Sequence, residues 1–202
     1  MTPDPLLLAQ LERARSLGFL GPGPVVDHLE HAAGFVAALH DVTGRVVDLG
    51  SGGGVPGLPL ALGRPDLIVV LVDATAKRCR FLEEAVAALD LADRVSVVEG
   101  RAEVVGRGDL RGTVDAVVAR SFGPPAATAE CAAPLLRIGG RLVVSEPPEG
   151  APRWPAAGLR ALGMAPLDQL ATRPRLQIVT QISACPDEYP RRDGLPAKRP
   201  LF

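Results

Sequence analysis

The residues with the clearest chemical potential lie in one short stretch, VVDLGSGGGVPG, which runs from Val46 to Gly57. There Asp48 is followed closely by five glycines: Gly50, Gly52, Gly53, Gly54 and Gly57. Glycine weakens helices and strands, so a cluster this dense is costly unless the backbone itself has a function there. The stretch therefore predicts a loop that a ligand approaches closely, with a carboxylate just before it.

A second acidic residue ends the next apolar run. Asp73 lies near the end of LIVVLVDA (67–74), as Asp48 does in RVVDLG (45–50). If both runs are parallel strands, their carboxyl ends lie on the sheet edge where α/β folds bind ligands. An acid there can accept both hydroxyls of a ribose, and the loop amides with the following helix N-terminus favour an anionic group. Together the two motifs predict a site for an adenosine cofactor.

Two cofactors fit these motifs. Gly52-x-Gly54-x-x-Gly57, with Asp73 about 20 residues further on, matches the dinucleotide fingerprint and leaves an NAD-binding Rossmann protein as an alternative. Asp48 favours S-adenosylmethionine (SAM), because a carboxylate attracts its ammonium and sulfonium and repels a pyrophosphate. Two like charges about 4 Å apart cost on the order of 4 kcal/mol at an effective dielectric of about 20.

Short apolar runs recur from Arg45 onward, and we expect each to be a strand. Five lie at 45–50, 67–74, 95–100, 114–120 and 139–146, and two more are expected between 164 and 183. Their hydrophobicity is continuous rather than alternating, which is typical of strands buried on both faces of a parallel sheet. Helical stretches at 74–90 and 124–137 lie between them, so the sequence predicts βαβ units and a doubly wound α/β fold.

The ends of the chain differ from this alternation. Residues 1–40 are predicted to form a helical cap, with helices at 6–17 and 25–40, before a single Rossmann-like domain at 41–202. The second helix carries three histidines that are at least as easily solvated as functional: His28, His31 and His40. The proline-rich, basic tail from Cys185 onward is not expected to be regular.

Composition excludes several classes of protein. The formal net charge of −1 argues against a large nucleic-acid footprint, although a local basic patch remains possible. Three scattered cysteines argue against a disulfide frame, and we expect no metal site. No apolar run reaches the roughly 18 residues of a membrane helix, and the N-terminus does not resemble a secretory signal. We expect a cytoplasmic, monomeric protein that does not enter a membrane.

Five motifs resemble the RsmG (GidB) family: DLGSGGGVPGLPLAL (48–62), VDATAKRCRFLEE (72–84), GRAE (100–103), VVARSFGPP (117–125) and YPRRDGLPAKRPL (189–201). The resemblance implies a class I SAM-dependent methyltransferase that modifies guanine N7 in small-subunit (16S) ribosomal RNA. It also implies a Rossmann-like α/β fold with a mostly parallel seven-stranded sheet and helices on both faces. The ribosomal RNA or the small ribosomal subunit would be the partner.

The resemblance assigns roles to residues of this chain. Asp48, the loop residues Gly50, Ser51, Gly52 and Gly54, the ribose-binding Asp73, the adenine neighbours Ala102 and Glu103, and Arg120 would bind the cofactor. Arg120 closes the site and is the one candidate for a catalytic role on the substrate side. The chain departs from the family at Val55, usually Phe, and at Glu146-Pro147, usually Lys-Gly.

Other residues could contact RNA. Arg120 could contact a phosphate or the guanine edge, or pair with Asp73 or Glu103 instead. Phe122 could stack on a base or pack under a helix. Two basic groups could either grip phosphates or be structural and solvated: Lys77, Arg78 and Arg80, and the tail residues Arg191, Arg192, Lys198 and Arg199.

Guanine N7 carries an in-plane lone pair and no proton, so its methylation needs no general base, only close positioning. The lack of a Ser-His-Asp or paired-carboxylate arrangement fits this chemistry. Two alternatives stay open. Glu146 and the near-neutral charge would also suit a SAM-dependent methyltransferase of a small molecule or protein, and the chain could be a binding module that retains SAM or a nucleotide without turnover.

Overall fold

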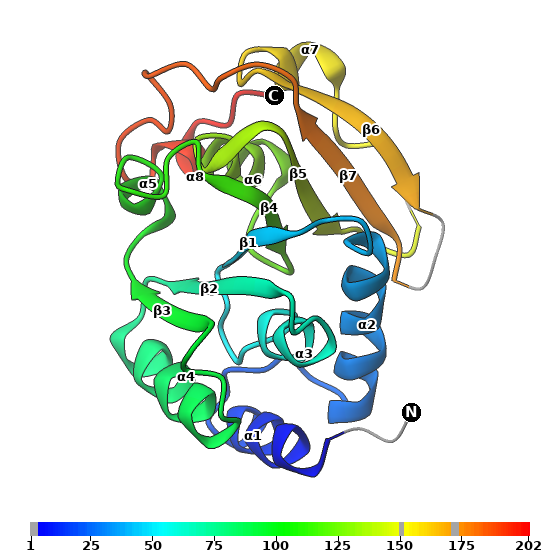
Figure 1. The fold of residues 1–202 in the computed structure, drawn as a ribbon. Coiled ribbons are helices and arrows are strands. Elements are labelled where there is room, and N and C mark those ends of the chain that lie inside the picture. The colour runs from blue at the N-terminus through cyan, green and yellow to red at the C-terminus, as the bar shows by residue number, and fades with distance from the viewer. Residues whose placement is uncertain (1–3, 150–151, 171–173) are drawn as a thin grey trace.

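A twisted seven-stranded sheet forms the centre of the protein (Figure 1). The computed structural model describes residues 4–149, 152–170 and 174–202. The strands are β1 (Gly44–Leu49), β2 (Leu67–Asp73), β3 (Val95–Glu99), β4 (Val114–Ala119), β5 (Leu136–Ser145), β6 (Met164–Leu170) and β7 (Leu176–Gln181). Their order is β3-β2-β1-β4-β5-β7-β6, with β1 to β5 parallel and β7 antiparallel to both its neighbours. The predicted strands and the mostly parallel sheet are confirmed.

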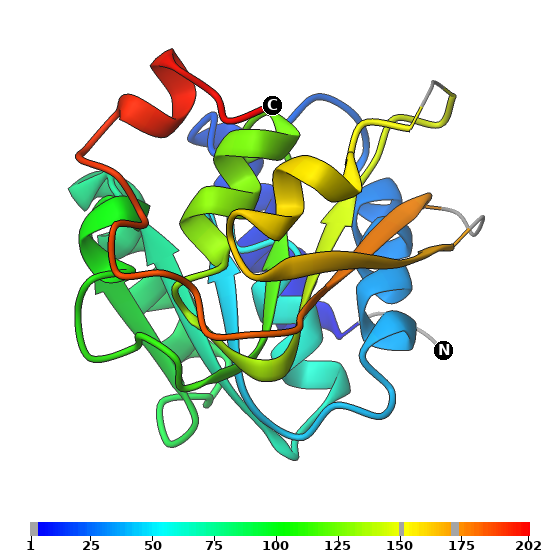
Figure 2. The same cartoon turned by 90° about the horizontal axis from the view of Figure 1, so that it is seen from above.

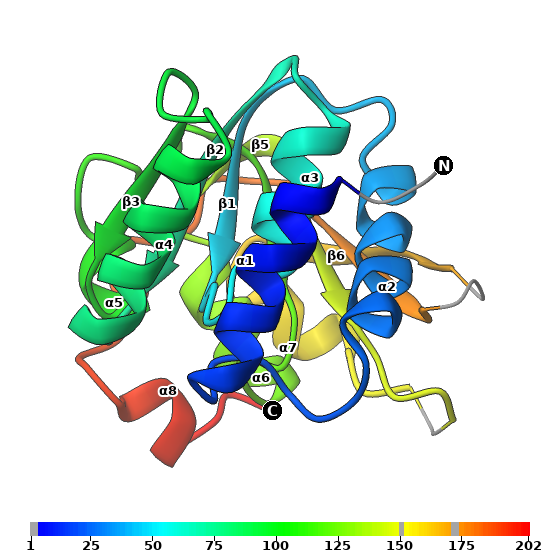
Figure 3. The same cartoon turned by 90° about the horizontal axis from the view of Figure 1, so that it is seen from below.

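Helices cover both faces of the sheet, as predicted. One face, in front in Figure 3, carries α1 (Pro5–Ser16), α2 (Val25–Ala38), α3 (Gly57–Gly63) and α4 (Ala76–Ala88). The other face, seen from above in Figure 2, carries α5 (Ala102–Val105), α6 (Pro125–Ala132), α7 (Ala156–Arg160) and α8 (Leu195–Lys198). In the part of the chain that the structure describes, no helix combines the length and apolar character needed to cross a bilayer.

Two hydrophobic cores explain why the strands are apolar at nearly every position. Side chains alternate along a strand, so Val46 packs under α1 to α4 while Val47 and Leu49 pack against α6 and its neighbours. All three are fully buried. A strand between two helical layers needs apolar residues on both faces, and this is the continuous pattern in the sequence.

The N-terminal helices pack into the same core as the sheet. The Asp4 carboxylate caps α1 by accepting hydrogen bonds from the main-chain N–H groups of Leu6 and Leu7, at 2.8 and 3.0 Å. Leu11 of α1 and Phe35 of α2 are fully buried in the core that α3 and α4 share. The role of residues 1–40 as a cap stays a prediction.

The boundary between α6 and β5 differs from the sequence prediction. The helix ends at Ala132 instead of 137, and the strand begins at Leu136 instead of 139. Gly139 lies inside the strand with φ +82°, where the register between β4 and β5 shifts. The sequence prediction began the strand at this glycine pair, whereas in the structure the pair lies inside the strand, at an irregularity.

The C-terminal tail crosses the α6 face and is tied down mainly through its main chain. The Arg107 guanidinium donates to the carbonyl oxygens of Pro190 and Arg191, and the Arg111 guanidinium donates to those of Tyr189, Cys185 and Pro186. The short helix α8 lies in this tail, which was expected to be irregular. The tail is therefore part of the folded domain.

Candidate functional site

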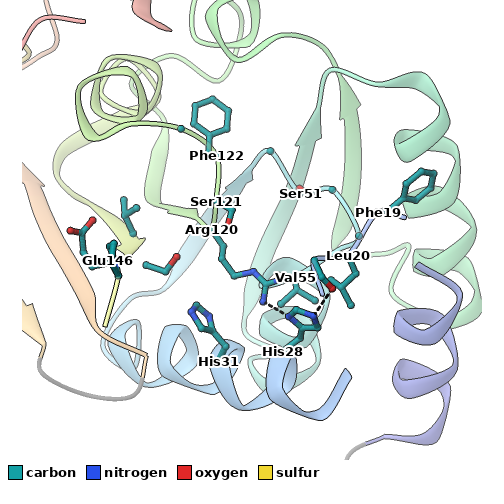
Figure 4. A pocket seen from close by; sticks show the side chains of 18 of the residues that line it. Phe19, Leu20, His28, His31, Ser51, Val55, Arg120, Ser121, Phe122 and Glu146 are labelled. Atoms are coloured by element: carbon teal, nitrogen blue, oxygen red, sulfur yellow. Dashed lines mark hydrogen bonds between the residues drawn. The ribbon is translucent and has the colours of Figure 1, made fainter. Parts of the chain in front are cut away.

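A pocket of about 670 Å³ opens at the carboxyl ends of β1, β4 and β5 (Figure 4). It lies beside the point where the strand order reverses, between β1 and β4, as expected for an open α/β sheet. Its walls come from five segments: Phe19–Pro22; His28 and His31 of α2; Gly50–Gly53 and Val55; Arg120–Gly123 and Pro125; and Val144–Pro147 with Arg153 and Trp154. Arg78 completes the lining.

The glycine loop is fixed onto the end of β2. The N–H groups of Gly50 and Ser51 both donate to the carbonyl oxygen of Val72 at 2.9 Å, and the N–H of Gly52 donates to the Asp73 carboxylate at 3.0 Å. Gly50 and Gly52 have φ of +76° and +55°, a backbone region that other residues rarely adopt. These three amides have partners within the chain, and the expectation of an anionic group at the loop stays a prediction.

Asp48 lies behind the loop and not on the pocket wall. Its carboxylate is buried, and Oδ2 accepts a hydrogen bond from the Gly57 N–H at 3.0 Å, while Oδ1 has no partner among the described residues. Burial raises the pKa of Asp48 to about 7, and the Gly57 hydrogen bond opposes that rise. A positive charge placed in the pocket would stabilise the ionised form. The site therefore favours a cationic ligand over a pyrophosphate.

Leu71 and Asp48 leave no room for a side chain at Gly57. A β-carbon at this position would overlap Leu71 Cδ2 and lie 2.6 Å from Asp48 Oδ2, inside van der Waals contact. We expect Gly57→Ala to lower the free energy of unfolding by about 1–3 kcal/mol through overpacking, measured by urea denaturation. Gly63→Ala in the same helix is the control, because its β-carbon would meet Val36 only at 3.5 Å. Equal stability of the two variants would contradict the conclusion that position 57 has no room for a β-carbon.

Asp73 lies beside the pocket at the end of β2. Its carboxylate accepts from the N–H of Gly52 and, at 2.9 Å, from the N–H of Thr75, and lies 3.6 Å from Arg78 Nη1. Only 4% of Asp73 is exposed. The hydrogen bonds hold it against the loop as the sequence suggested, and its role toward a ribose stays a prediction.

Arg120 directly follows β4 and points into the pocket (Figure 4). Among the described residues it forms neither of the salt bridges considered from the sequence, to Asp73 or Glu103. Its Nη1 instead lies 3.1 Å from Nδ1 of His28. Burial lowers the pKa of Arg120, and the nearby Asp48 carboxylate partly offsets this effect. The predicted substrate-side cation is thus in the pocket, with a partner that sequence reasoning missed.

The sequence left open whether the two histidines of the pocket are solvated or functional. His28 and His31 are three residues apart on α2, a spacing that places them on one helix face, and this signal was available in the sequence. Both face the pocket (Figure 4). Burial, with the Arg120 charge second, lowers the pKa of His31 to about 4. The ring of His31 is therefore neutral at physiological pH.

Ala102 and Glu103 do not line this pocket. Ala102 packs in the core beside α6, and Glu103 Oε1 accepts a hydrogen bond from the Gly194 N–H at 2.7 Å. Glu103 also lies 3.7 Å from Arg101. The GRAE turn therefore contacts the C-terminal tail in this structure, and its role beside an adenine stays a prediction.

Glu146 is neutralised by the segment that follows it. Its carboxylate accepts from Nε and Nη2 of Arg153, at 3.1 and 2.9 Å, and from Nε1 of Trp154 at 3.1 Å. The carboxylate is buried, whereas 43% of the Arg153 side chain is exposed at the pocket. A free Glu146 carboxylate would repel a polyanionic substrate, but here it holds the Arg153 cation at the pocket.

The tail arginine Arg191 is structural. Its main-chain N–H, Nε and Nη2 all donate to the Glu130 carboxylate, which is fully buried in α6, at 2.6 to 2.9 Å. The neighbouring Arg192, Lys198 and Arg199 are exposed. Of the tail cations considered as phosphate contacts, these three remain accessible.

The sheet order, the antiparallel β7 and the glycine loop between two strand-end carboxylates define a Rossmann-like class I methyltransferase fold. A methyltransferase from Geobacter sulfurreducens has the same fold, with a TM-score of 0.63 at 14% identity, covering 90% of this chain and 92% of that one. The cofactor-bound protein Rv0187 from MTB superimposes with a TM-score of 0.62 at 20% identity and the same coverage.

The chain belongs to the GidB family. The family's sequence model, described as rRNA small subunit methyltransferase G, matches residues 24–146. The protein named ribosomal RNA small subunit methyltransferase G from Roseiflexus castenholzii is 40% identical over 174 residues, which cover 80% of this chain and 73% of that protein. Its namesake from Rubrobacter xylanophilus is 38% identical over 213 residues, covering 97% and 80%. The resemblance seen in the sequence motifs is confirmed.

Proposed function

We propose that this protein transfers a methyl group from SAM to N7 of a guanine in small-subunit ribosomal RNA. The observation that carries the proposal is the pocket itself, with the glycine loop on one side and Arg120 on the other. Family membership supports the substrate class, because the relatives carry that activity in their names. Such an enzyme would act in the cytoplasm, and we propose that it does so as a monomer.

The residues present fit SAM. A pocket of about 670 Å³ is within the usual range for a cofactor of this size. The unpartnered Oδ1 of Asp48 supplies negative potential beneath the loop, and the nearby Asp73 carboxylate accepts hydrogen bonds at the end of β2. Gly50, Ser51 and Gly52 would border the methionine part. Bound there, SAM would supply an electrophilic methyl group on a positively charged sulfur.

The chain's own contribution is binding and orientation. Guanine N7 has no proton to lose, so no side chain needs to act as a general base. His28 and His31 line the pocket, and among the described residues neither accepts support from a hydrogen-bonded carboxylate, which fits a reaction without a general base. Arg120 can donate hydrogen bonds to the guanine edge or to a phosphate. Phe19, Val55 and Phe122 would limit the access of water.

Exposed cations around the opening would bind the RNA backbone. Arg78 and Arg153 line the pocket, with 40% and 43% of their side chains exposed, and Lys77 precedes Arg78 on α4. A protein that neutralises phosphates loses affinity with salt, by about 0.7 log units per contact and decade of salt on single strands. A flat salt response would favour a small-molecule or protein substrate.

The test is methyl incorporation from labelled SAM into small ribosomal subunits or naked rRNA from a strain lacking this activity. The wild type should produce 7-methylguanine at one position, mapped by borohydride reduction and aniline cleavage. Arg120→Ala should lose most of the signal, while Arg160→Ala, an exposed arginine on α7, should retain it. No signal above the Arg120→Ala background, with SAM bound, would overturn the proposed substrate.

A further inference from the structure

A chain of two hydrogen bonds links three separate segments at the pocket. Nδ1 of His28, on α2, lies 3.1 Å from Nη1 of Arg120, which follows β4. Nε2 of the same ring lies 3.1 Å from the carbonyl oxygen of Gly21. Gly21 belongs to the α1–α2 linker that forms one pocket wall. Figure 4 shows His28 between the linker and the Arg120 guanidinium.

The partners of His28 determine its tautomer. A carbonyl oxygen can only accept, so Nε2 must carry the proton that it donates to Gly21. A guanidinium can only donate, so Nδ1 must offer a lone pair to Arg120. Both hydrogen bonds form only when the ring is neutral with its proton on Nε2. A second proton would place an N–H against the guanidinium and break the link.

The surrounding charges keep the ring in this form. Burial is the main cause that lowers the pKa of His28, and the Arg120 charge is the second. The Gly21 hydrogen bond and the Asp27 carboxylate act in the opposite direction. His31 faces His28 as a neutral ring, and Asp48 interacts with Arg120 from β1.

We propose that His28 is a positioning residue, which holds the Arg120 guanidinium in the pocket by accepting its hydrogen bond at Nδ1. The proposal rests on the proposed function, in which Arg120 contacts the acceptor nucleotide. The bond to His28 is the one side-chain hydrogen bond of Arg120 in the part of the chain that the structure describes. Without it the long side chain has several rotamers, and a misplaced contact group of this kind costs up to about 100-fold in rate.

Two isosteric variants separate the hydrogen bond to Arg120 from the hydrogen bond to Gly21. In His28→Asn the amide oxygen takes the place of Nδ1 and can still accept from Arg120, but nothing reaches Gly21. In His28→Gln the amide nitrogen takes the place of Nε2 and can still donate to Gly21, but Arg120 has no acceptor. We expect His28→Gln to lose roughly 10- to 100-fold in kcat and His28→Asn to stay close to wild type. SAM affinity should be unchanged in both, and His40→Asn, an exposed histidine, is the control.

The pH profile supplies a readout that a purely structural role would not change. At saturating SAM and RNA, kcat of the wild type should fall as the pH drops and His28 gains its second proton, while the profile of His28→Asn should be flatter. Equal kcat for His28→Gln and wild type, or equal losses in both variants, would overturn the inference.

A measurement without substrate separates this inference from the proposed function. Nitrogen-15 NMR of the free protein should show His28 with an unprotonated Nδ1 and a protonated Nε2, and Arg120→Leu should shift the Nδ1 resonance. A proton on Nδ1 would overturn the positioning role alone. The expected tautomer in a wild type that binds SAM but transfers no methyl group to rRNA would overturn the proposed function instead.

Discussion

Asp48→Asn is expected to make the free protein more stable at pH 8, although it removes a buried hydrogen-bonded acid. The pKa of Asp48 is raised to about 7 in the folded protein, mainly by burial, while an unfolded aspartate titrates near pH 3.9. Between these values the folded protein retains a proton that the unfolded chain releases, so stability falls as the pH rises from about 4 to 7. Above pH 7 the loss is complete.

Asparagine has the same shape as aspartate but carries no charge, so the free-energy cost of ionising a buried carboxylate is absent. We expect a gain in unfolding free energy of up to about 4 kcal/mol at pH 8, from about 1.4 kcal/mol per unit of pKa shift. The gain should shrink steadily toward pH 5 in urea titrations. Asp109→Asn, an exposed acid, is the control and should show no such trend. Parallel pH curves for Asp48→Asn and wild type would contradict the raised pKa.

The same substitution should weaken SAM binding and reduce the dependence of SAM affinity on pH. A cationic ligand stabilises the Asp48 carboxylate, so binding releases the proton and tightens as the pH rises through 7. Calorimetry should show affinity increasing roughly tenfold between pH 6 and pH 7.5 in wild type, one decade per pH unit below the pKa of the free protein. Asp48→Asn should bind more weakly at pH 7.5 and show little pH dependence. If Asp48→Asn gains stability but keeps the SAM affinity of the wild type, the Asp48 charge does not act on the cofactor.

Arg191→Ala is expected to cause the largest loss of stability among the tail variants. It leaves the Glu130 carboxylate, which is fully buried, without a counter-charge. Breaking a buried pair in this way costs about 3–5 kcal/mol. We expect a value near the lower end, measured by urea denaturation, because the main-chain N–H at position 191 still donates to Glu130.

Arg192→Ala is the matched control, since its side chain is exposed and should change stability by less than about 0.5 kcal/mol. The double variant Glu130→Ala/Arg191→Ala should recover part of the loss, because it removes the buried charge as well as its partner. If Arg191→Ala and Arg192→Ala were equally stable and both weakened RNA binding, Arg191 would be a phosphate contact instead.

The strands could be predicted from the sequence because each is buried on both faces, which leaves an uninterrupted apolar run such as 67–74. The boundary between α6 and β5 was missed because Leu136 and Arg137 continue the helix-like stretch 124–137, and only the pairing of β4 with β5 shows that they belong to the strand. The short helices α3, α5 and α7 were missed because four to seven residues are too few to display helical periodicity.

The site was predicted in part for a similar reason. Asp48, Asp73 and the glycines belong to a local motif, so their spacing along the chain indicates their proximity. The partner of Arg120, His28, is 92 residues away along the chain and is brought to the pocket by the fold, whereas Arg153, the partner of Glu146, is only seven residues away. Local patterns therefore indicated the glycine loop and its two carboxylates, whereas the contact between Arg120 and His28 depends on the tertiary fold; which side of the pocket holds the cofactor stays a prediction.

The way Arg107 and Arg111 hold the tail has a consequence for tolerance to sequence change. The carbonyl oxygens that accept their hydrogen bonds are present whatever side chain a residue carries. The path of the tail can therefore persist while many of its residues drift, provided the two guanidiniums remain. A library randomised at Pro186 and Arg192 should stay largely folded, whereas replacement of Arg111 alone should release the segment to proteolysis.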